Sequence, residues 1–237
     1  MHRRDLTMPM LAENLALDEA LLLEAEAGGP EVLRFWEWPN HAVVLGAGGK
    51  VAEEANIETC EAEGVPIVRR SSGGGTVLLG RGCLMYSLVL SYTRDPRLAD
   101  LHASSRVILD RMVEALRPFA DGVRWDGISD LVIGDRKFSG NAQQRKRGHL
   151  LHHGTLLYDF DLAAIPKYLA PPPRMPDYRR ARPHGDFVMN FPATAESIRR
   201  AVAKAWNAHD ALGGLPSERV EKLMKEKYGH SAWHRRR

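Results

Sequence analysis

The sequence predicts an α+β protein with a mainly antiparallel, mixed sheet flanked by helices. Short strand-like runs follow one another with turn-sized gaps, as in hairpins, and helical segments lie on either side of them. The regular strand–helix–strand alternation of a doubly wound parallel sheet is missing. No internal repeat or low-complexity linker divides the 237 residues, so we expect residues 1–237 to form a single domain.

The first half of the chain predicts two helices and five strands. Leu11, Leu15 and Leu22 recur near helical spacing, and the Gly28-Gly29-Pro30 segment ends that pattern, which predicts a helix over 11–27. A second helix is expected over 53–63, where Gly64 follows it. Runs rich in β-branched and apolar residues predict strands over 32–36, 41–46, 66–70, 76–79 and 83–92.

The second half predicts four helices and three more strands, two of which form a hairpin. Apolar residues at helical spacing predict an amphipathic helix over 104–119. A hairpin is expected from 131–133 into 137–138, a strand over 149–160 and a short helix over 161–169. The Pro- and Arg-rich segment 171–192 is expected to be a long loop, and helices are expected over 194–209 and 217–228.

Composition excludes several classes of protein. With 44% hydrophobic and 27% charged residues the chain resembles a globular protein, and no apolar run is long enough for a membrane span. The net charge of +3 suits an anionic ligand or an acidic protein partner and falls short of a nucleic-acid signature. Two cysteines make no disulfide framework, and an acidic helix follows the basic N-terminus in place of a secretion signal. We therefore expect a cytoplasmic protein.

The strongest local signal is a triple glycine between two predicted strands. Gly73, Gly74 and Gly75 allow the backbone to approach a ligand closely and to point free amide groups at phosphate oxygens. Arg69 and Arg70, separated from the glycines by two serines, add positive charge with bidentate geometry. A triple glycine alone is more often a flexible turn, and this one matches no phosphate-loop pattern. The two arginines favour the ligand interpretation.

A second segment, residues 127–143, places a lysine among small residues. Lys137 and Ser139 are expected to share one face of a strand, where the ammonium group can hold a carbonyl or phosphate oxygen. Asp130 on the preceding strand can supply a carboxylate to Mg²⁺ or cap a turn. A lysine on a solvated hairpin is the alternative interpretation.

The third segment contains adjacent histidines in a predicted strand. His152 and His153 must point to opposite faces, so one of them at most faces a given site. No third ligand lies at a spacing typical of zinc. We therefore do not expect a zinc site.

Taken in order, these segments resemble the lipoate–protein ligases, members of the biotin/lipoate ligase and octanoyltransferase superfamily. The resemblance spans nearly the whole chain, and it implies the class II synthetase-like biotin/lipoyl ligase fold. It rests on the Glu13–Glu19 helix, Arg69 to Gly75, Tyr86-Ser87, Asp130 to Ala142, the His152 to Leu157 strand, and Lys227-Tyr228 with Trp233.

The resemblance implies a role for each matching residue. Lys137 would be the catalytic residue that contacts the acyl carbonyl and the α-phosphate, and Asp130 would lie near the adenine or a Mg²⁺ ion. Contacts to the acyl group and nucleotide would come from Arg69, Arg70, Ser72, Gly73, Gly74, Gly75, Thr76, Val77, Asp130, Gly140, Asn141, Ala142, His153 and Gly154. Leu78, Leu79 and Leu84 are candidates for an apolar acyl tunnel.

The resemblance also implies a two-step reaction. ATP, with Mg²⁺, would activate lipoate or octanoate as an acyl-AMP, and the acyl group would pass to a lysine of a lipoyl-domain or glycine-cleavage-H-like acceptor protein. Neither a nucleic acid nor a membrane is an expected partner. The sequence ends where larger relatives continue into a C-terminal accessory domain, so we expect no such domain here. Either that domain is a separate chain, or the enzyme works without it, or the chain performs only the transfer half.

A biotin ligase is disfavoured, because the Gly-Arg-Gly-Arg loop of that branch is absent. Two other rival functions remain at this point. Octanoyltransferases share the fold but form a thioester on a cysteine and use no ATP, and neither position typical of that cysteine carries one here. Cys83 lies in an apolar strand start and is interpreted as a core residue. A non-catalytic acyl-binding relative is the other alternative. The turn 80–84 and the segment 46–55 also depart from the ligase pattern.

Overall fold

The computed structural model describes residues 1–172, 175–210 and 214–236. The strands of its larger sheet are β1 (His2–Asp5), β2 (Val32–Glu37), β6 (Cys83–Ser91), β7 (Val123–Asp126), β8 (Asp130–Ile133), β9 (Arg136–Arg145), β10 (His149–Leu157) and β11 (His209–Asp210). The strands of the smaller sheet are β3 (Ala42–Leu45), β4 (Ile67–Arg69) and β5 (Val77–Leu79).

The larger sheet has the order β11-β1-β2-β6-β10-β9-β8-β7, and the smaller one has the order β4-β3-β5. Hairpin-like neighbours from β2 to β7 pair antiparallel, whereas β1 pairs in parallel with both β2 and β11. The smaller sheet contains one parallel pair and one antiparallel pair. The predicted class, an α+β fold with a mainly antiparallel mixed sheet, is confirmed.

The α-helices among the described residues are α1 (Leu11–Glu26), α2 (Val51–Glu54), α3 (Ile57–Ala62), α4 (Leu101–Leu116), α5 (Ala164–Tyr168), α6 (His184–Phe187), α7 (Ala195–Ala205), α8 (Ser217–Leu223) and α9 (Ser231–His234). Short helical turns of other types are η1 (Pro96–Ala99), η2 (Arg117–Phe119), η3 (Asp177–Arg179) and the π-type η4 (Met224–Tyr228). In the described part of the chain, no helix is both long and apolar enough to cross a membrane.

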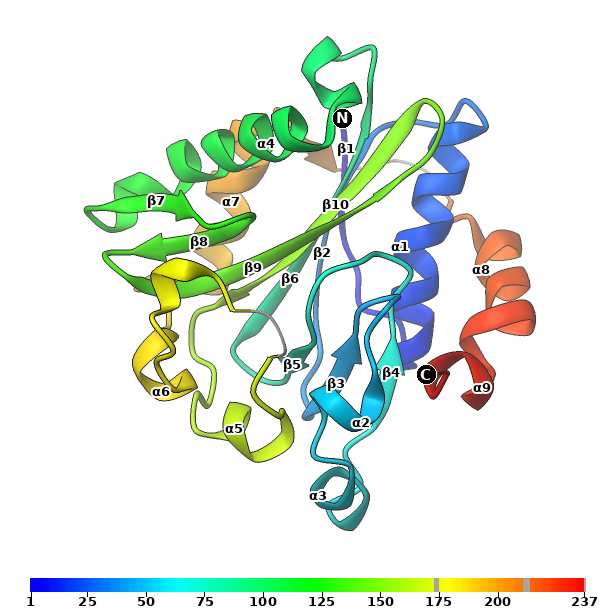
Figure 1. Cartoon of the computed structure of the whole chain (residues 1–237). Helices are drawn as coiled ribbons and strands as arrows, with labels where there is room; N and C mark the ends of the chain where they lie inside the picture. Colours follow the sequence, from blue (N-terminus) through cyan, green and yellow to red (C-terminus); the bar gives the residue numbers. More distant parts are fainter. Residues whose placement is uncertain (173–174, 211–213, 237) are drawn as a thin grey trace.

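The two faces of the larger sheet belong to two separate cores. On one face, α1, the smaller sheet and α8 pack together, and on the other face lie α4 and α7 (Figure 1). Alternate residues of β10 therefore enter different cores, as Leu151 and Leu156 do. Leu78 and Leu79 belong to the α1 core and Leu84 to the α4 core, so these three leucines do not line one common tunnel.

Several elements differ from the sequence prediction. The predicted helix over 53–63 is interrupted at Ala55, which is extended at φ −127° and bridges to Leu169. Strands β1, β7 and β11 were not predicted, because they are short and lack apolar alternation. The predicted loop over 171–192 contains η3 and α6, while its residues 173–174 lie outside the described residues.

Candidate active site

Two rows of residues cross the α1 face of the larger sheet. Directly opposed residues in a sheet point to the same face, so the pairing register of β2, β6, β10 and β9 defines each row. The first row is Arg34, Ser87, His153 and Ala142, and the second is Trp36, Met85, Thr155 and Gly140. These rows form the floor on which the glycine loop, residues 72–75, lies.

The glycine loop touches both the floor and the neighbouring segment at Gly46. A Cβ atom on Gly74 would lie 3.3 Å from the Ala142 Cβ atom, and one on Gly46 would lie 2.1 Å from the Gly74 carbonyl oxygen. Gly74 also has a φ of +83°, which glycine adopts more readily than other residues. The amide of Ala47 donates to the Ser72 carbonyl at 2.7 Å. Glycine is therefore required at 46 by close backbone approach and favoured at 74 by its positive φ.

The buried Arg70 side chain forms hydrogen bonds with three residues of the glycine loop. Its guanidinium donates to the carbonyl groups of Gly73 at 2.6 Å and Gly75 at 2.8 Å, and its Nε donates to the Ser72 hydroxyl oxygen at 3.0 Å. Burial lowers the pKa of Arg70 to about 10, so the group keeps its charge at neutral pH. The loop that was predicted to bind phosphate is therefore built around a buried cation.

Arg69 has a different set of contacts. Its Nη1 donates to the Gly46 and Gly49 carbonyls at 2.9 and 2.7 Å. Its Nε and Nη2 donate to the carbonyls of Trp233 and Arg236 at 3.1 and 2.6 Å. This geometry gives Arg69 a role in anchoring the C-terminal residues, and its ligand contact stays a prediction.

The two residues after the glycines continue into β5. The Thr76 hydroxyl donates to the Glu54 carboxylate at 2.7 Å, and Val77 pairs with Val44 in the smaller sheet. Thr76 therefore connects the loop to α2. The predicted substrate contacts of both residues stay predictions.

Lys137 lies on the floor beside Gly140. Its Nζ is 2.7 Å from the Asp130 carboxylate, and a Cβ atom on Gly140 would lie 2.7 Å from the same Nζ. A bulge pairs Lys137 with Val132 and Ser139 with Leu131, so the expectation that Lys137 and Ser139 share a face was wrong. Lys137 keeps 28% of its side chain exposed, which leaves its ammonium group accessible to a ligand.

Asp130 does not form a metal site by itself. Its second carboxylate oxygen accepts a hydrogen bond from the Tyr178 hydroxyl at 2.7 Å. Among the described residues, no group of three His, Cys, Asp or Glu side chains is placed to hold a metal ion. Mg²⁺ is often held by one or two carboxylates and by the phosphate oxygens of a nucleotide. The predicted Mg²⁺ contact at Asp130 stays a prediction.

A segment over 175–192 covers the β8–β9 hairpin next to Lys137. The Met189 amide donates to the Lys137 carbonyl at 2.8 Å, and Arg182 forms an ion pair of 2.8 Å with Asp135. Burial, Arg179 and Lys137 together lower the pKa of His184 to about 4, so His184 is neutral beside these cations. Sequence analysis missed this contribution because the segment has no regular periodicity.

Asn141 and Gly154 meet on the opposite, α4, face of the sheet. The Asn141 side chain accepts a hydrogen bond from the Tyr86 hydroxyl at 2.5 Å and donates to the Ser129 carbonyl at 2.7 Å. A Cβ atom on Gly154 would lie 1.9 Å from the Asn141 Oδ1 atom. These contacts fix β9 against β10, and the predicted ligand contacts of Asn141 and Gly154 stay predictions.

His153 connects the floor to both the glycine loop and α1. Its Nε2 lies 2.5 Å from the Ser72 hydroxyl oxygen, and its Nδ1 lies 3.6 Å from an Asp18 carboxylate oxygen. The other Asp18 oxygen is 2.5 Å from the Arg34 guanidinium, and both residues are buried. Sequence analysis did not select Asp18 or Arg34. The available signal was a carboxylate in the middle of an otherwise apolar helix.

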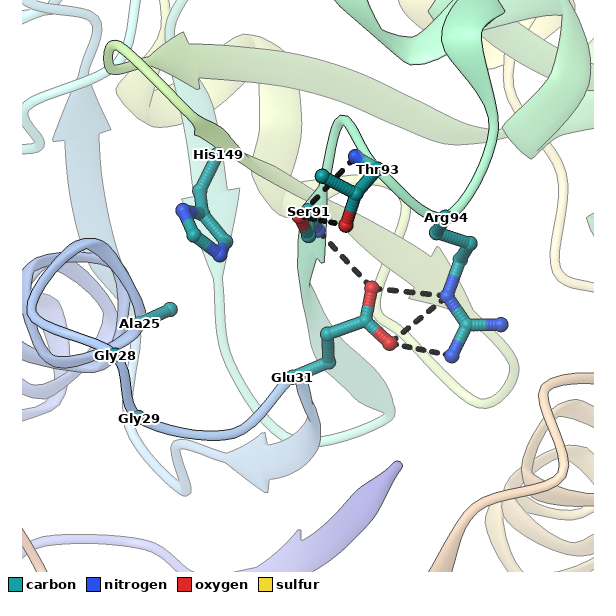
Figure 2. Close-up of a pocket in the computed structure, with 8 residues that line it drawn as sticks. All are labelled: Ala25, Gly28, Gly29, Glu31, Ser91, Thr93, Arg94 and His149. Carbon is teal, nitrogen blue, oxygen red and sulfur yellow. Dashed lines mark hydrogen bonds and ion pairs between the residues drawn. The ribbon is translucent and has the colours of Figure 1, made fainter.

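A pocket of about 510 Å³ opens elsewhere, at the far end of α1 (Figure 2). Glu31 lies at its centre and binds the Arg94 side chain and the Ser91 amide. The pocket contains none of the predicted site residues. It is lined by Ala25, Gly28, Gly29, Glu31, Ser91, Thr93, Arg94 and His149.

Comparison with known families assigns the chain. Residues 11–208 match the model of the lipoyl protein ligase A/B catalytic domain. The chain belongs to this family. That assignment confirms the resemblance read from the glycine, lysine and histidine segments, and it makes the protein a member of an enzyme family that contains lipoate ligases and octanoyltransferases.

Relatives of both kinds align with nearly the whole chain. Octanoyltransferase LipM of Kyrpidia tusciae is 29% identical over 262 residues, covering 95% of each chain. Lipoate-protein ligase LplJ of Bacillus subtilis is 25% identical over 235 residues, covering 93% of this chain and 69% of LplJ. The chain spans about half the length of other ligase-named relatives, 58% for one from Aeropyrum pernix and 45% for one from Mycoplasma pneumoniae.

Solved structures confirm the predicted fold. A bi-partite lipoate protein ligase from Thermoplasma acidophilum, described with its E2 lipoyl domain, has a TM-score of 0.84 at 22% identity, covering 99% of this chain and 95% of that one. A lipoate-protein ligase A bound with ATP has a TM-score of 0.81 at 22% identity, covering 99% of both chains. The chain therefore has the lipoate ligase fold.

Proposed function

We propose that the chain is a lipoate–protein ligase. It activates lipoate or octanoate with ATP to an acyl-AMP and transfers the acyl group to a lysine of an acceptor protein. The acceptor is a lipoyl domain or a glycine-cleavage-H-like protein. Both lipoate and ATP appear in the descriptions of ligases with this fold.

The observation that carries this proposal is the lack of a usable thiol. The chain has two cysteines, and both are buried. Cys83 lies in the apolar core with Met85, and burial raises the pKa of its thiol far above the usual range, which disfavours the nucleophilic thiolate. A thioester-forming transferase needs such a thiolate, whereas an adenylate-forming ligase needs only positioning and charge.

The site residues support the two steps of a ligase. The partly exposed Lys137 ammonium group can offset negative charge on the α-phosphate and on the acyl oxygen. The glycine loop offers backbone amides beside the buried Arg70 cation. Neither step requires a covalent enzyme intermediate. Residues 1–237 would act as one catalytic domain.

Two assays test the proposal with the purified chain. ATP–pyrophosphate exchange that depends on lipoate or octanoate measures adenylation, and the mass of an added lipoyl domain measures transfer. Lys137→Met should slow transfer by about 10²- to 10³-fold, whereas Lys146→Met, a control at an exposed lysine of the β9–β10 turn, should not. Transfer that proceeds equally well without ATP from an acyl thioester would contradict the ligase assignment.

A second candidate function is acyl transfer from a thioester donor without ATP. The full-length alignment with octanoyltransferase LipM favours it. It would require Cys83 or Cys60 as a nucleophile, so Cys83→Ser and Cys60→Ser should each be assayed with octanoyl thioester. An acyl adduct on either cysteine, detected by intact mass, would establish this function in place of the ligase.

The bi-partite organisation of the Thermoplasma ligase suggests how adenylation should be tested. We propose that a separate accessory chain assists adenylation, and that this chain alone suffices for transfer from presynthesised lipoyl-AMP. Adenylation by the chain alone at full rate would contradict the need for a second chain.

Free, buried cysteines support the reducing cytoplasm as the proposed location.

A further inference from the structure

A continuous polar chain leads from the glycine loop into the protein interior. Ser72, His153 and Asp18, here named the relay, are linked by distances of 2.5 Å between Ser72 Oγ and His153 Nε2, and 3.6 Å between His153 Nδ1 and Asp18 Oδ2. The three residues come from a loop, a strand and a helix that are far apart in sequence. A serine, a histidine and a carboxylate in this order form a path for a proton.

The neighbouring groups allow the Ser72 hydroxyl to donate its proton to His153. The Nε–H group of Arg70 donates to the Ser72 oxygen at 3.0 Å. The Ser72 hydroxyl proton is therefore available to His153 Nε2, and the relay uses the imidazole whose unprotonated Nε2 faces Ser72. The remaining proton of that imidazole is on Nδ1 and faces Asp18. In that tautomer His153 can accept a proton from Ser72.

The far end of the relay is built to stabilise a protonated histidine. Burial alone would raise the pKa of Asp18, but Arg34 and His153 outweigh burial, and the pKa of Asp18 is lowered. Asp18 therefore stays ionised while only 3% exposed. The Ser87 hydroxyl, next to His153 in the sheet, is buried and has no hydrogen-bond partner among the described residues. The Ser87 hydroxyl can therefore form a hydrogen bond with a water molecule or a ligand.

The relay also lies at a suitable place relative to Lys137. His153 is paired with Ala142, and Ala142 is two residues along β9 from Gly140, which lies under the Lys137 Nζ atom. Two residues of a strand span about 7 Å. An acyl group held by Lys137 at one end of this interval would present its carbonyl carbon towards the loop that carries Ser72.

We propose that the relay removes the proton from the acceptor lysine during acyl transfer; this inference rests on the proposed function. The uncharged amine attacks the carbonyl carbon, and a C–N bond forms. The nitrogen gives a proton to Ser72 Oγ while Ser72 gives its own proton to His153 Nε2. The bond between the acyl carbon and the phosphate oxygen breaks, and AMP leaves with the electron pair. His153, charged beside Asp18, then returns the proton to solvent.

A single-turnover experiment with presynthesised lipoyl-AMP tests the relay separately from adenylation. The variants are Ser72→Ala and His153→Gln, and the acceptor is either a lipoyl domain or hydroxylamine. Hydroxylamine needs less help from a general base, because its protonated form is far more acidic than that of lysine. Matched controls are Ser91→Ala and His149→Gln, which change the same residue types in the distant pocket of Figure 2.

Transfer to the lipoyl domain should fall by about 10²- to 10⁴-fold in either relay variant, the usual contribution of a positioned base. The double variant should fall no further, because the two residues act as a unit. Reaction with hydroxylamine should change little, and both controls should match the unchanged protein. Equal losses with both acceptors would show that Ser72 and His153 only hold the acyl group, and would overturn the relay.

Two further outcomes are decisive. An acyl adduct on Ser72, found by mass spectrometry of the quenched reaction, would replace the relay with a covalent acyl-serine mechanism. If the unchanged chain uses only an acyl thioester, the proposed ligase function fails, and the same variants are then compared with that donor. Asp18→Asn is unsuitable as the primary test, because it also removes the partner of buried Arg34.

Discussion

The two faces of the larger sheet use adjacent histidines of β10 in opposite ways. His152 lies on the α4 face, fully buried, with the Tyr86 hydroxyl 3.2 Å from its Nε2. Burial lowers its pKa to about 3, so it is neutral throughout the physiological range. His153 lies on the α1 face between the Ser72 hydroxyl and the Asp18 carboxylate. Only His153 has a carboxylate in position to stabilise its charged form.

The difference shows how one sheet combines stability with chemistry. The α4 face contains neutral hydrogen bonds such as the one between Tyr86 and Asn141, which hold the strands in register. The α1 face contains charged groups that are buried but paired, namely Arg34 with Asp18, and a partly exposed ion pair between Lys137 and Asp130. We therefore expect changes on the α4 face to affect stability alone, and most changes on the α1 face to affect activity.

The largest effect is expected for Arg34→Met. Although Arg34 lies on the α1 face, we expect this change to affect stability more than activity. Without Arg34 the Asp18 carboxylate would stay buried with no cation beside it. Removing one partner of a buried pair typically costs about 3–5 kcal/mol. Urea unfolding monitored by circular dichroism measures this loss. A change below about 1 kcal/mol would mean that Asp18 is far more hydrated than the structure indicates.

Lys137→Met should lower the rate of acyl transfer by about 10²- to 10³-fold, as expected when one electrostatic contact to the transition state is removed. Its effect on stability should be small, because the Lys137–Asp130 pair is partly exposed and such pairs contribute little. Single-turnover transfer and a melting curve on the same sample measure both quantities. Loss of stability with normal transfer would show that Lys137 has a structural role, as the residues of the α4 face do.

His152→Gln should change how stability depends on pH. The unfolded chain takes up a proton on His152 near the ordinary histidine pKa of 6.5, whereas burial lowers the pKa in the folded chain to about 3. Between these values the unfolded state binds more protons, so falling pH lowers stability by about 1.4 kcal/mol per pH unit. That contribution is fully present above about pH 6.5. The variant should lose it, giving a shallower slope in unfolding measured from pH 7.5 to 4.

Gly154→Ala should destabilise the protein by about 1–3 kcal/mol through overpacking. The new methyl group would lie 1.9 Å from Asn141 Oδ1, which Tyr86 already holds. Gly148→Ala is the matched control on the same hairpin, where the added atom would lie 3.4 Å from the end of the Glu26 side chain. Equal stability of both variants in thermal melts would contradict the tight packing described for the α4 face.

The smallest effect is expected for Arg94→Ala in the pocket of Figure 2. Arg94 pairs with Glu31, and their side chains are 32% and 19% exposed. Surface pairs of this kind contribute about 0–1 kcal/mol. Neither transfer nor adenylation should change. A loss of activity in this variant would show that the far pocket takes part in the function.

The sequence was most informative where residue type alone limits the structure. Residue type alone, without knowledge of tertiary contacts, indicates the chemistry of the glycine segment, Lys137 and the His152–His153 pair. The long strands and α1 were predicted from apolar periodicity. Arg34 and Asp18 were missed, because only tertiary packing places a strand arginine against a helix carboxylate. The bulge at Lys137 was missed for the same reason, since its pairing with β8 is not local.

Arg69 joins the end of the chain to the base of the glycine loop. Its backbone and side chain bond Trp233, His234 and Arg236, and Trp233 Nε1 donates back to the Arg69 carbonyl at 2.9 Å. A protease that cuts within 229–236 would deprive a buried guanidinium of several acceptors at once. Because Arg69 also contacts the segment beside the glycine loop, we expect such cleavage to make the loop less ordered. Fusion tags for biophysical work are better placed at the other terminus.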